Sequence, residues 1–380
     1  MRVGIDIRVL GSPLKSGVEE YTENLLLHMI PENPNINFKL FFSGKNEVLK
    51  KYSWINLENV ELVESHFSSR STFLSSLIFN YPKIDNLLGG VEAFFSPHFI
   101  LAPLNLNCRR IMTFHDLSYL RFKEFFSLKR NLWHQLQLGS FGKKNLPDKI
   151  IAVSNSTRDD IINKYGIESH RVEKIYSGIV RKKEKPTQKE LEDFRLKNGL
   201  PKKFILFLGK LEPRKNIPAL IKAFEYLKNT KDFQDLHLVV VGAKGWLFKN
   251  IFKEAEMSFY KNRIMFKDYI NDEEKFFYYS LASVFVYASF FEGFGFPPLE
   301  AMACGTPVVV SNNSSLPEIV GDSGILVDPC NIADISNGII AILKDENLRS
   351  VLIKRGYEKS KMFDWKKCSD KTLQVILGKY

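Results

Sequence analysis

The sequence predicts an α/β protein with two consecutive doubly wound parallel sheets. Three observations indicate this fold class. The chain has 380 residues, which is too many for one hydrophobic core, so two domains are expected. Short apolar runs alternate with longer amphipathic stretches, which is typical of βαβ units. The alternation occurs in two series, and a charged segment separates them.

The first series predicts an N-terminal Rossmann-like domain over residues 1–185. Amphipathic stretches predict helices at Val18–Ile30 and Ser154–Tyr165. Apolar runs predict strands at Val3–Ile7, Phe38–Phe42, Val60–Val63, Ala93–Ser96, Arg110–Phe114 and Lys149–Val153.

The second series predicts another domain of the same kind over residues 186–363. The charged segment before it, residues 181–201, has a proline near each end and predicts an exposed helix at Gln188–Asn198. Strands are expected at Phe204–Leu208, Leu236–Val241, Ile264–Phe266, Val284–Ala288, Pro307–Ser311 and Gly324–Val327. Helices are expected at Ile217–Leu227, Asn271–Ser280, Pro298–Ala303 and Ile332–Lys344. Ligands of such sheets bind at the carboxyl ends of the strands.

The composition excludes several classes of protein. Hydrophobic residues make up 44% and charged residues 26%, as in ordinary globular proteins. No apolar run reaches the roughly 18 residues of a membrane-spanning helix, and the N-terminus predicts a strand and not a signal peptide. The four cysteines are widely spaced without a CxxC pair, so we expect no disulfides, no structural metal and a cytoplasmic location. The net charge of +11 suits an anionic partner, with a plain lysine-rich surface as the equal alternative.

Residues 291–310, FEGFGFPPLEAMACGTPVVV, hold the main candidate site. Gly293 and Gly295 allow positive φ and a close approach to a ligand. The prolines at 297 and 298 then begin a helix, whose N-terminus favours a phosphate. Glu300 lies in the first turn, where its carboxylate can accept hydrogen bonds from a sugar diol. Glutamates at this spacing are common, and Gly-Pro clusters often mark plain turns, but the combination between two buried strands is far more specific.

This Glu-x7-Glu element closely resembles the signature of the retaining GT-B glycosyltransferases of family 4. Four further stretches resemble the family in the expected order: KSGVEEYTENLL (15–26), TFHDLSYL (113–120), KIIAVSNSTRDDI (149–161) and FILFLGKLEPRKNIPALIKAF (204–224). The resemblance covers the whole chain and is greatest to bacterial mannosyltransferases of surface-polysaccharide synthesis. It implies the GT-B fold, in which two Rossmann-like domains face each other across a cleft. It also implies that a C-terminal helix near Trp365–Leu377, within residues 364–380, crosses back to the N-terminal domain.

The resemblance implies a donor site in the C-terminal domain. Glu292, Gly293, Phe294 and Gly295 would hold the transferred sugar and the diphosphate, and Glu300 would bind the ribose hydroxyls. For Glu300 the alternative is a solvated helix carboxylate.

Three basic residues are candidates for neutralising the departing diphosphate, as preorganised cations do well. Lys215 matches the family lysine. Where the family usually has an arginine, this sequence has Lys210. This is a departure from the pattern, since lysine supplies charge but lacks the planar guanidinium of arginine. Arg214 is a candidate for part of that role, and surface charge is the alternative for Arg214 and Lys210.

The remaining candidates carry over from the same family. Gly17 would pack against the diphosphate from the N-terminal domain, with a helix-capping glycine as the alternative. His115, at the carboxyl end of a predicted strand, would contact the transferred sugar, with a structural histidine as the alternative. Tyr269 and Ile270 would lie near the nucleotide base.

The expected function is transfer of a hexose, with mannose from GDP-mannose favoured, to a glycan or lipid-linked sugar with retention at the anomeric carbon. The donor is a substrate, and no metal or other cofactor is expected because no DxD-like motif lies in a ligand loop. UDP-sugars are the alternative donors. The alternatives are a non-catalytic GT-B binding subunit and a nucleotide-sugar epimerase of the same fold. No nucleic-acid-binding module is recognisable, so nucleic acid is not an expected partner.

Two stretches of the N-terminal half suit an anionic membrane surface. Residues 122–144 mix aromatic and basic side chains, and residues 67–88 are apolar and aromatic with two basic residues. Such stretches bind anionic lipid, and packing into the domain core is the equal alternative. We therefore expect a peripheral location on the inner face of the cytoplasmic membrane.

Overall fold

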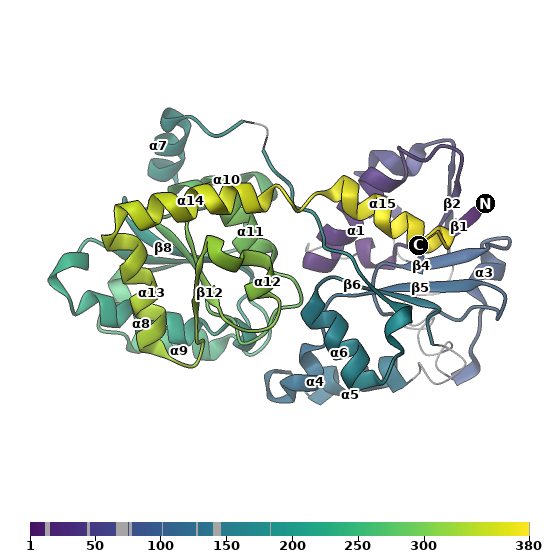
Figure 1. The fold of residues 1–380 in the computed structure, drawn as a ribbon, viewed down its shortest axis with the longest axis horizontal. Helices are drawn as coiled ribbons and strands as arrows, with labels where there is room; N and C mark the ends of the chain where they lie inside the picture. Colours follow the sequence, from purple (N-terminus) through teal and green to yellow (C-terminus); the bar gives the residue numbers. More distant parts are fainter. Residues whose placement is uncertain are drawn as a thin grey trace. The chain divides into compact units, whose positions relative to one another are not determined.

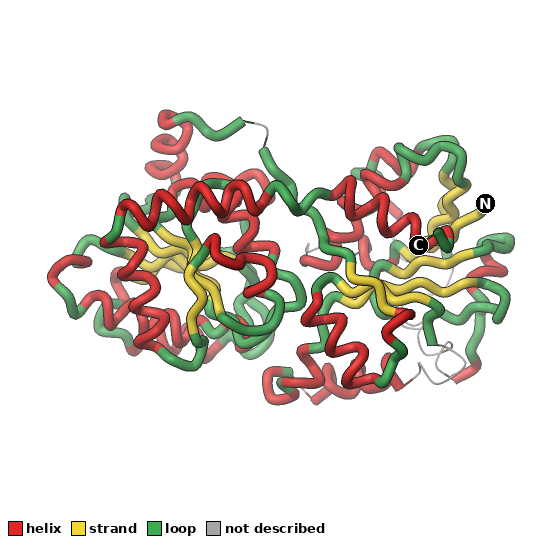
Figure 2. Tube along the Cα trace, viewed as in Figure 1, coloured by secondary structure: helices red, strands yellow, loops and turns green. Residues whose placement is uncertain are grey.

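The computed structural model describes residues 1–11, 16–43, 46–65, 75, 78–100, 102–126, 128–139, 146–182 and 184–379. They form two compact units, each with one sheet between layers of helices (Figures 1 and 2). Unit 1 comprises Met1–Arg121, Leu128–Gly178 and Asp364–Tyr380, and unit 2 comprises Phe122–Ser127 and Ile179–Phe363. The division thus lies between residues 178 and 179, whereas the sequence placed it after residue 185. That Phe122–Ser127 belongs to unit 2 was not expected.

Unit 1 contains a seven-stranded sheet in the order β3-β2-β1-β4-β5-β6-β7. Every neighbouring pair of strands is parallel. The strands are β1 (Arg2–Asp6), β2 (Asn37–Phe42), β3 (Val60–Glu64), β4 (Ala93–Ser96), β5 (Arg109–Phe114), β6 (Lys149–Ala152) and β7 (Val172–Lys174). Their apolar runs are largely buried, as expected for a parallel sheet covered on both faces.

The helices of unit 1 lie on both faces of this sheet (Figure 1). They are α1 (Gly17–Met29), α3 (Ile84–Leu87), α4 (Ser118–Arg121), α5 (Leu128–Gly139), α6 (Asn155–Tyr165) and α15 (Trp365–Leu377). The C-terminal helix α15 packs beside α1, where the rings of Trp365 and Tyr21 meet edge to face at 5.8 Å. The C-terminal residues therefore rejoin the N-terminal unit, which is the crossing back that the sequence predicted.

Unit 2 contains a six-stranded parallel sheet in the order β10-β9-β8-β11-β12-β13. The strands are β8 (Phe204–Leu208), β9 (His237–Val241), β10 (Ile264–Lys267), β11 (Val284–Tyr287), β12 (Val308–Ser311) and β13 (Ile325–Val327). The helices are α7 (Gln188–Lys197), α8 (Ile217–Lys228), α9 (Lys249–Met257), α10 (Asp272–Leu281), α11 (Phe296–Ala303), α12 (Leu316–Val320), α13 (Ile332–Lys344) and α14 (Glu346–Ser360). Helices α8, α9 and α13 cover one face, and α10, α11 and α14 cover the other (Figure 1).

Each sheet has a point where the strand order reverses, next to its first strand. In unit 1 this point lies between β1 and β4, and in unit 2 it lies between β8 and β11. The loops that follow the two strands diverge there, and the crevice between them is where open α/β sheets bind ligands. In unit 2 those loops carry Arg214 and Lys215 after β8 and Glu292 after β11.

Candidate functional site

The site is built on the β8–α8 loop of unit 2. A single 3-10 turn, Pro213–Lys215, buries Arg214 and Lys215. It ends at Asn216, which adopts a left-handed conformation with φ of 54°. The Asn216 side chain donates hydrogen bonds to the carbonyls of Ala288 at 3.0 Å and Pro329 at 2.8 Å. The loop after β8 is therefore tied to the end of β11, which fixes where the two cations point.

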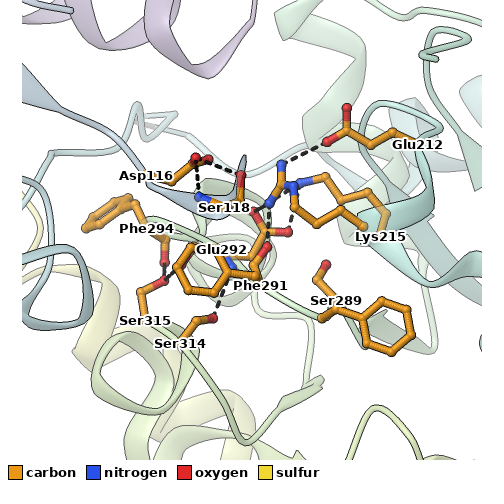
Figure 3. A network of polar contacts seen from close by, with 12 residues as sticks. Asp116, Ser118, Glu212, Lys215, Ser289, Phe291, Glu292, Phe294, Ser314 and Ser315 are labelled. Carbon is orange, nitrogen blue, oxygen red and sulfur yellow. Dashed lines mark hydrogen bonds and ion pairs between the residues drawn. The ribbon is translucent and has the colours of Figure 1, made fainter. Parts of the chain in front are cut away.

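The Glu292 carboxylate binds both cations, Lys215 and Arg214 (Figure 3). Lys215 Nζ lies 2.8 and 3.0 Å from the two carboxylate oxygens, and Arg214 Nη1 lies 2.8 Å from Oε2. The other arm of Arg214 reaches Glu212 Oε1 at 2.8 Å, and Lys215 also donates to the Tyr287 hydroxyl at 2.6 Å. Four charged side chains, two of each sign, are thus buried together at the switch point of the sheet.

The protonation states follow from burial and from these neighbours. Burial alone would raise the pKa of Glu292, but Arg214 and Lys215 outweigh it and lower the pKa to about 2. Burial, and next the charge of Arg214, lower the pKa of Lys215. The two cations are therefore held in place before any ligand arrives, which preorganises positive charge at the switch point.

This network predicts a pH-dependent contribution to stability. The pKa of Glu292 falls from its ordinary value of 4.5 to about 2 on folding. Its contribution is therefore complete above about pH 5 and is lost as the pH falls toward 2. We expect Glu292→Gln to unfold more easily than the wild type by about 3 kcal/mol at pH 7, and we expect this gap to close between pH 5 and 2. Urea unfolding at several pH values measures this difference in unfolding free energy, with the exposed Glu346→Gln as control. A difference that stays constant with pH would refute the lowered pKa of Glu292.

The loop around Glu292 is held by a polar segment that follows β12, residues 313–315 (Figure 3). The amide of Glu292 donates to Ser314 Oγ at 3.0 Å. The Ser315 hydroxyl lies 3.0 Å from the carbonyl of Glu292 and 2.6 Å from that of Phe294. Asn313 donates to the carbonyl of Phe290 at 3.0 Å. The sequence analysis missed these residues, although a run of small polar residues after a buried strand was a signal for them.

Helix α11 begins immediately after this loop. Its N-cap is Gly295, with φ of 117°, and Pro297 lies in its first turn. The carbonyl and ring of Phe294 are buried beside it, and Gly293 lies between the two buried positions. The positive end of the α11 dipole favours an anion there, although Pro297 and Pro298 have no N–H to donate. The structure therefore brings Glu292, Gly293, Phe294 and Gly295 to one place, together with the cations of the β8–α8 loop.

Glu300 lies on α11 and is buried. The Tyr279 hydroxyl donates to its Oε2 at 2.7 Å, and Lys275 Nζ lies 3.7 Å from its Oε1. The solvated-helix alternative for this carboxylate is therefore wrong, because the side chain is enclosed and partnered.

Three predicted donor residues lie outside the ion network. Lys210 is exposed and lies over the ring of Trp246, 5.7 Å from its centre. Tyr269 and Ile270 follow β10, the edge strand of the sheet, and Tyr269 is exposed. The buried arginine of the site is Arg214, so the structure places Arg214 and not Lys210 beside Lys215.

His115 follows β5 in unit 1. Its Nε2 lies 2.8 Å from the carbonyl oxygen of Pro97. Because a carbonyl only accepts, Nε2 carries the proton and Nδ1 is the acceptor. Burial of the imidazole lowers its pKa to about 4, so the ring is neutral at pH 7. A neutral histidine in this tautomer can accept a hydrogen bond from a sugar hydroxyl through Nδ1.

Gly17 is the first residue of α1 and is exposed. It follows the N-cap Ser16, whose amide donates to Glu19 Oε2 at 3.0 Å. This is the helix-opening position that the sequence analysis gave as the alternative, and the loop residues 12–15 before it lie outside the described residues.

The switch point of unit 1 holds a second buried charge cluster that the sequence analysis missed. Arg8 Nε lies 2.9 and 3.1 Å from the two carboxylate oxygens of Asp6, and Arg8 Nη2 lies 2.6 Å from Oδ2. His98 Nε2 lies 3.6 Å from Asp6 Oδ1. Burial would raise the pKa of Asp6, but Arg8 and His98 outweigh it and lower that pKa. An aspartate and an arginine two residues apart at the end of an apolar strand were the signal in the sequence.

The described residues contain no group of three or more His, Cys, Asp or Glu side chains that could hold a metal ion. All four cysteines are free thiols.

Comparisons with known proteins agree with this architecture. The family model of the glycosyl transferases group 1 matches residues 188–359, and that of glycosyltransferase family 4 matches residues 15–183. O-antigen chain mannosyltransferase B of Escherichia coli is 32% identical over 273 residues, which is 70% of each chain. The serotype-specific mannosyltransferase WbdA of E. coli is 30% identical over 69% of this chain but only 32% of its own length.

A solved structure shows the same fold. Sucrose-phosphate synthase from Thermosynechococcus elongatus matches with a TM-score of 0.76 over 99% of this chain and 98% of the other, at 19% identity. The GT-B fold predicted from the sequence is thus confirmed. With a family 4 match in its N-terminal half and a group 1 match in its C-terminal half, the chain belongs to the family 4 glycosyltransferases and is a glycosyltransferase.

Proposed function

We propose that this glycosyltransferase moves mannose from GDP-mannose to a glycan or lipid-linked sugar of a cell-surface polysaccharide, with retention at the anomeric carbon and without a metal ion. The observation that carries the proposal is the buried network of Lys215, Arg214 and Glu292 beside the N-terminus of α11. Mannose as the transferred sugar is supported by the names of two E. coli relatives, both mannosyltransferases.

The proposed reaction exchanges one bond at the anomeric carbon for another. The bond between that carbon and the diphosphate oxygen breaks, and the acceptor hydroxyl forms a new bond on the same face. The acceptor proton passes to the departing phosphate oxygen. Lys215 and Arg214 would stabilise the negative charge that grows on the diphosphate, and the dipole of α11 would add to this. Glu292 would then turn toward the transferred sugar.

Product analysis tests this proposal. The protein is incubated with GDP-mannose and a lipid-linked mannosyl glycan in the presence of a chelator, and GDP release and the NMR spectrum of the glycan are measured. GDP-mannose carries an α linkage, so the proposal requires an α-mannosyl product. A β-linked product, or activity only after metal is added back, would contradict it.

We also propose that the enzyme works at an anionic membrane surface through α5. Leu128, Leu132 and Leu136 recur every four residues along this helix and are exposed, with Lys129 and Arg130 beside them. Apolar residues with flanking cations suit the boundary of an anionic bilayer. Residues 127 and 140–145 of the basic stretch, and residues 67–74, 76 and 77 of the earlier apolar stretch, lie outside the described residues. None of the described helices is long and apolar enough to span a bilayer.

Replacing Lys129 and Arg130 by serine is expected to weaken binding to vesicles that contain phosphatidylglycerol. Each basic residue near such a surface contributes about 1 kcal/mol, so we expect a loss of binding of roughly 10- to 30-fold in vesicle co-sedimentation. The pair Lys249→Ser and Lys253→Ser, exposed on α9, removes the same charge elsewhere and serves as control. Equal loss in both pairs would show that only net charge matters and would refute the role of α5.

A further inference from the structure

Two side chains of α10, those of Tyr279 and Lys275, contact the Glu300 carboxylate. Tyr279 Oη lies 2.7 Å from Oε2, and Lys275 Nζ lies 3.7 Å from Oε1. We propose that Tyr279, assisted by Lys275, is a positioning residue that fixes Glu300 for a vicinal diol and so makes the donor site select ribonucleotides over deoxyribonucleotides. The inference rests on the proposed function, with Glu300 binding the ribose of the nucleotide as the family resemblance implies.

The Tyr279 hydroxyl is itself rigidly held. Its ring is buried and meets Phe285 of β11 edge to face at 5.5 Å. The Thr306 hydroxyl donates to its backbone carbonyl at 2.5 Å. The helix that carries it begins with a capping box between Asn271 and Glu274. The phenol therefore reaches Glu300 from a framework that involves a strand, a helix and the turn after α11.

The phenol acts only as a donor toward Glu300. Burial, and next the negative charge of Glu300, raise the pKa of Tyr279 well above its ordinary value, so the proton stays on the hydroxyl. A carboxylate has about four lone-pair positions. Tyr279 uses one of them on Oε2, so two adjacent hydroxyls would use others.

The benefit of this arrangement lies in conformational entropy. Glutamate has three rotatable side-chain bonds, and a ligand that must order such a side chain loses affinity. Lys275 is fixed in turn by Asp272 at 2.8 Å, so it limits the motion of Oε1. A diol therefore meets a carboxylate that is already in place, while a sugar without hydroxyls gains nothing from it.

Calorimetric titration tests the inference with nucleoside diphosphates and their 2′,3′-dideoxy analogues. GDP, UDP and ADP are compared first, and the tightest binder is used. Hydrogen bonds to a charged group contribute enough to give the wild type a preference of about tenfold or more for the ribonucleotide. Tyr279→Phe is expected to lower this ratio by about three- to tenfold and to leave the affinity for the dideoxy analogue unchanged.

Three further variants make the outcomes distinct. Tyr278→Phe, a buried neighbour on the same helix, is expected to keep the ratio. Lys275→Met is expected to lower the ratio partly, and it gives a second reading if Tyr279→Phe folds poorly. Glu300→Gln tests the proposed function itself, because a ratio unchanged in this variant removes the diol role of Glu300. A ratio that falls in Glu300→Gln but stays intact in Tyr279→Phe and Lys275→Met overturns the inference alone. Equal weakening of both nucleotides in Tyr279→Phe shows a merely structural role and overturns it as well.

Discussion

Lys215→Ala is expected to lower kcat by roughly 100- to 1000-fold, because removal of one preorganised charge-stabilising group from a buried site has an effect of this size. Lys215 is buried, and its ammonium lies 2.8 Å from the Glu292 carboxylate at the switch point. Its role grows as the negative charge develops, so kcat should fall more than the donor affinity. Steady-state kinetics with GDP-mannose as the varied substrate measure both.

Lys222→Ala is the matched control for this variant. Lys222 lies on α8, the next element of the chain, and pairs with Glu254 at 3.5 Å with about half of its side chain exposed. The Lys222→Ala substitution therefore removes the same charge from the same unit without altering the site. If Lys215→Ala retains a tenth or more of the wild-type kcat, or if both variants lose activity equally, Lys215 does not stabilise the leaving group.

Gly295→Ala is expected to destabilise unit 2 and to abolish turnover. Gly295 has φ of 117°, a conformation that costs an L-residue about 1–3 kcal/mol. An added Cβ would also lie 2.9 Å from Leu316 Cδ2. A loss of about 3 kcal/mol would lower the midpoint of thermal unfolding by roughly 6–12 °C for a unit of this size. Because this residue opens α11, the loop of Glu292 should shift and the donor should no longer bind.

Gly321→Ala is the control for this variant, because it introduces backbone strain away from the site. Gly321 has φ of 58°, and an added Cβ would meet nothing within 4 Å. This variant should lower the midpoint through backbone strain alone, by roughly 2–12 °C, and keep full activity. Retention of donor binding in Gly295→Ala would show that the α11 N-terminus is not part of the site.

Most of the fold could be predicted because parallel strands are continuous apolar runs. Every strand predicted from the sequence is present, and Ile332–Lys344 and Trp365–Leu377 are helices with the predicted bounds. Strand β7, which has only three residues, was not predicted. The helices α3, α4, α5, α9, α12 and α14 were not predicted either, and α14 has a charged sequence with a weak apolar period. The place of Phe122–Ser127 in unit 2 depends on tertiary packing, which local patterns do not encode.

The site could be predicted where residue type and chain position coincide. Glu292, Gly295 and Glu300 lie on one short stretch between two buried strands, and this combination of residue types, which resembles the family signature, indicated a common site. The choice between Lys210 and Arg214 depended on which side chain turns inward, and that is decided by the 3-10 turn and by the left-handed Asn216. The supports of the site lie far along the chain and carry ordinary residue types, so no local pattern revealed them.

The most direct test of the account is the thermal unfolding of the wild type and of Lys215→Ala with GDP-mannose, UDP-glucose and free GDP. A ligand at 100 times its Kd stabilises the native state by about 2.7 kcal/mol. We expect GDP-mannose to raise the unfolding midpoint of the wild type more than UDP-glucose does, and we expect most of this rise to disappear in Lys215→Ala. No rise with any of the three, or an equal rise in both proteins, would contradict a nucleotide-sugar site at the β8–β11 switch point.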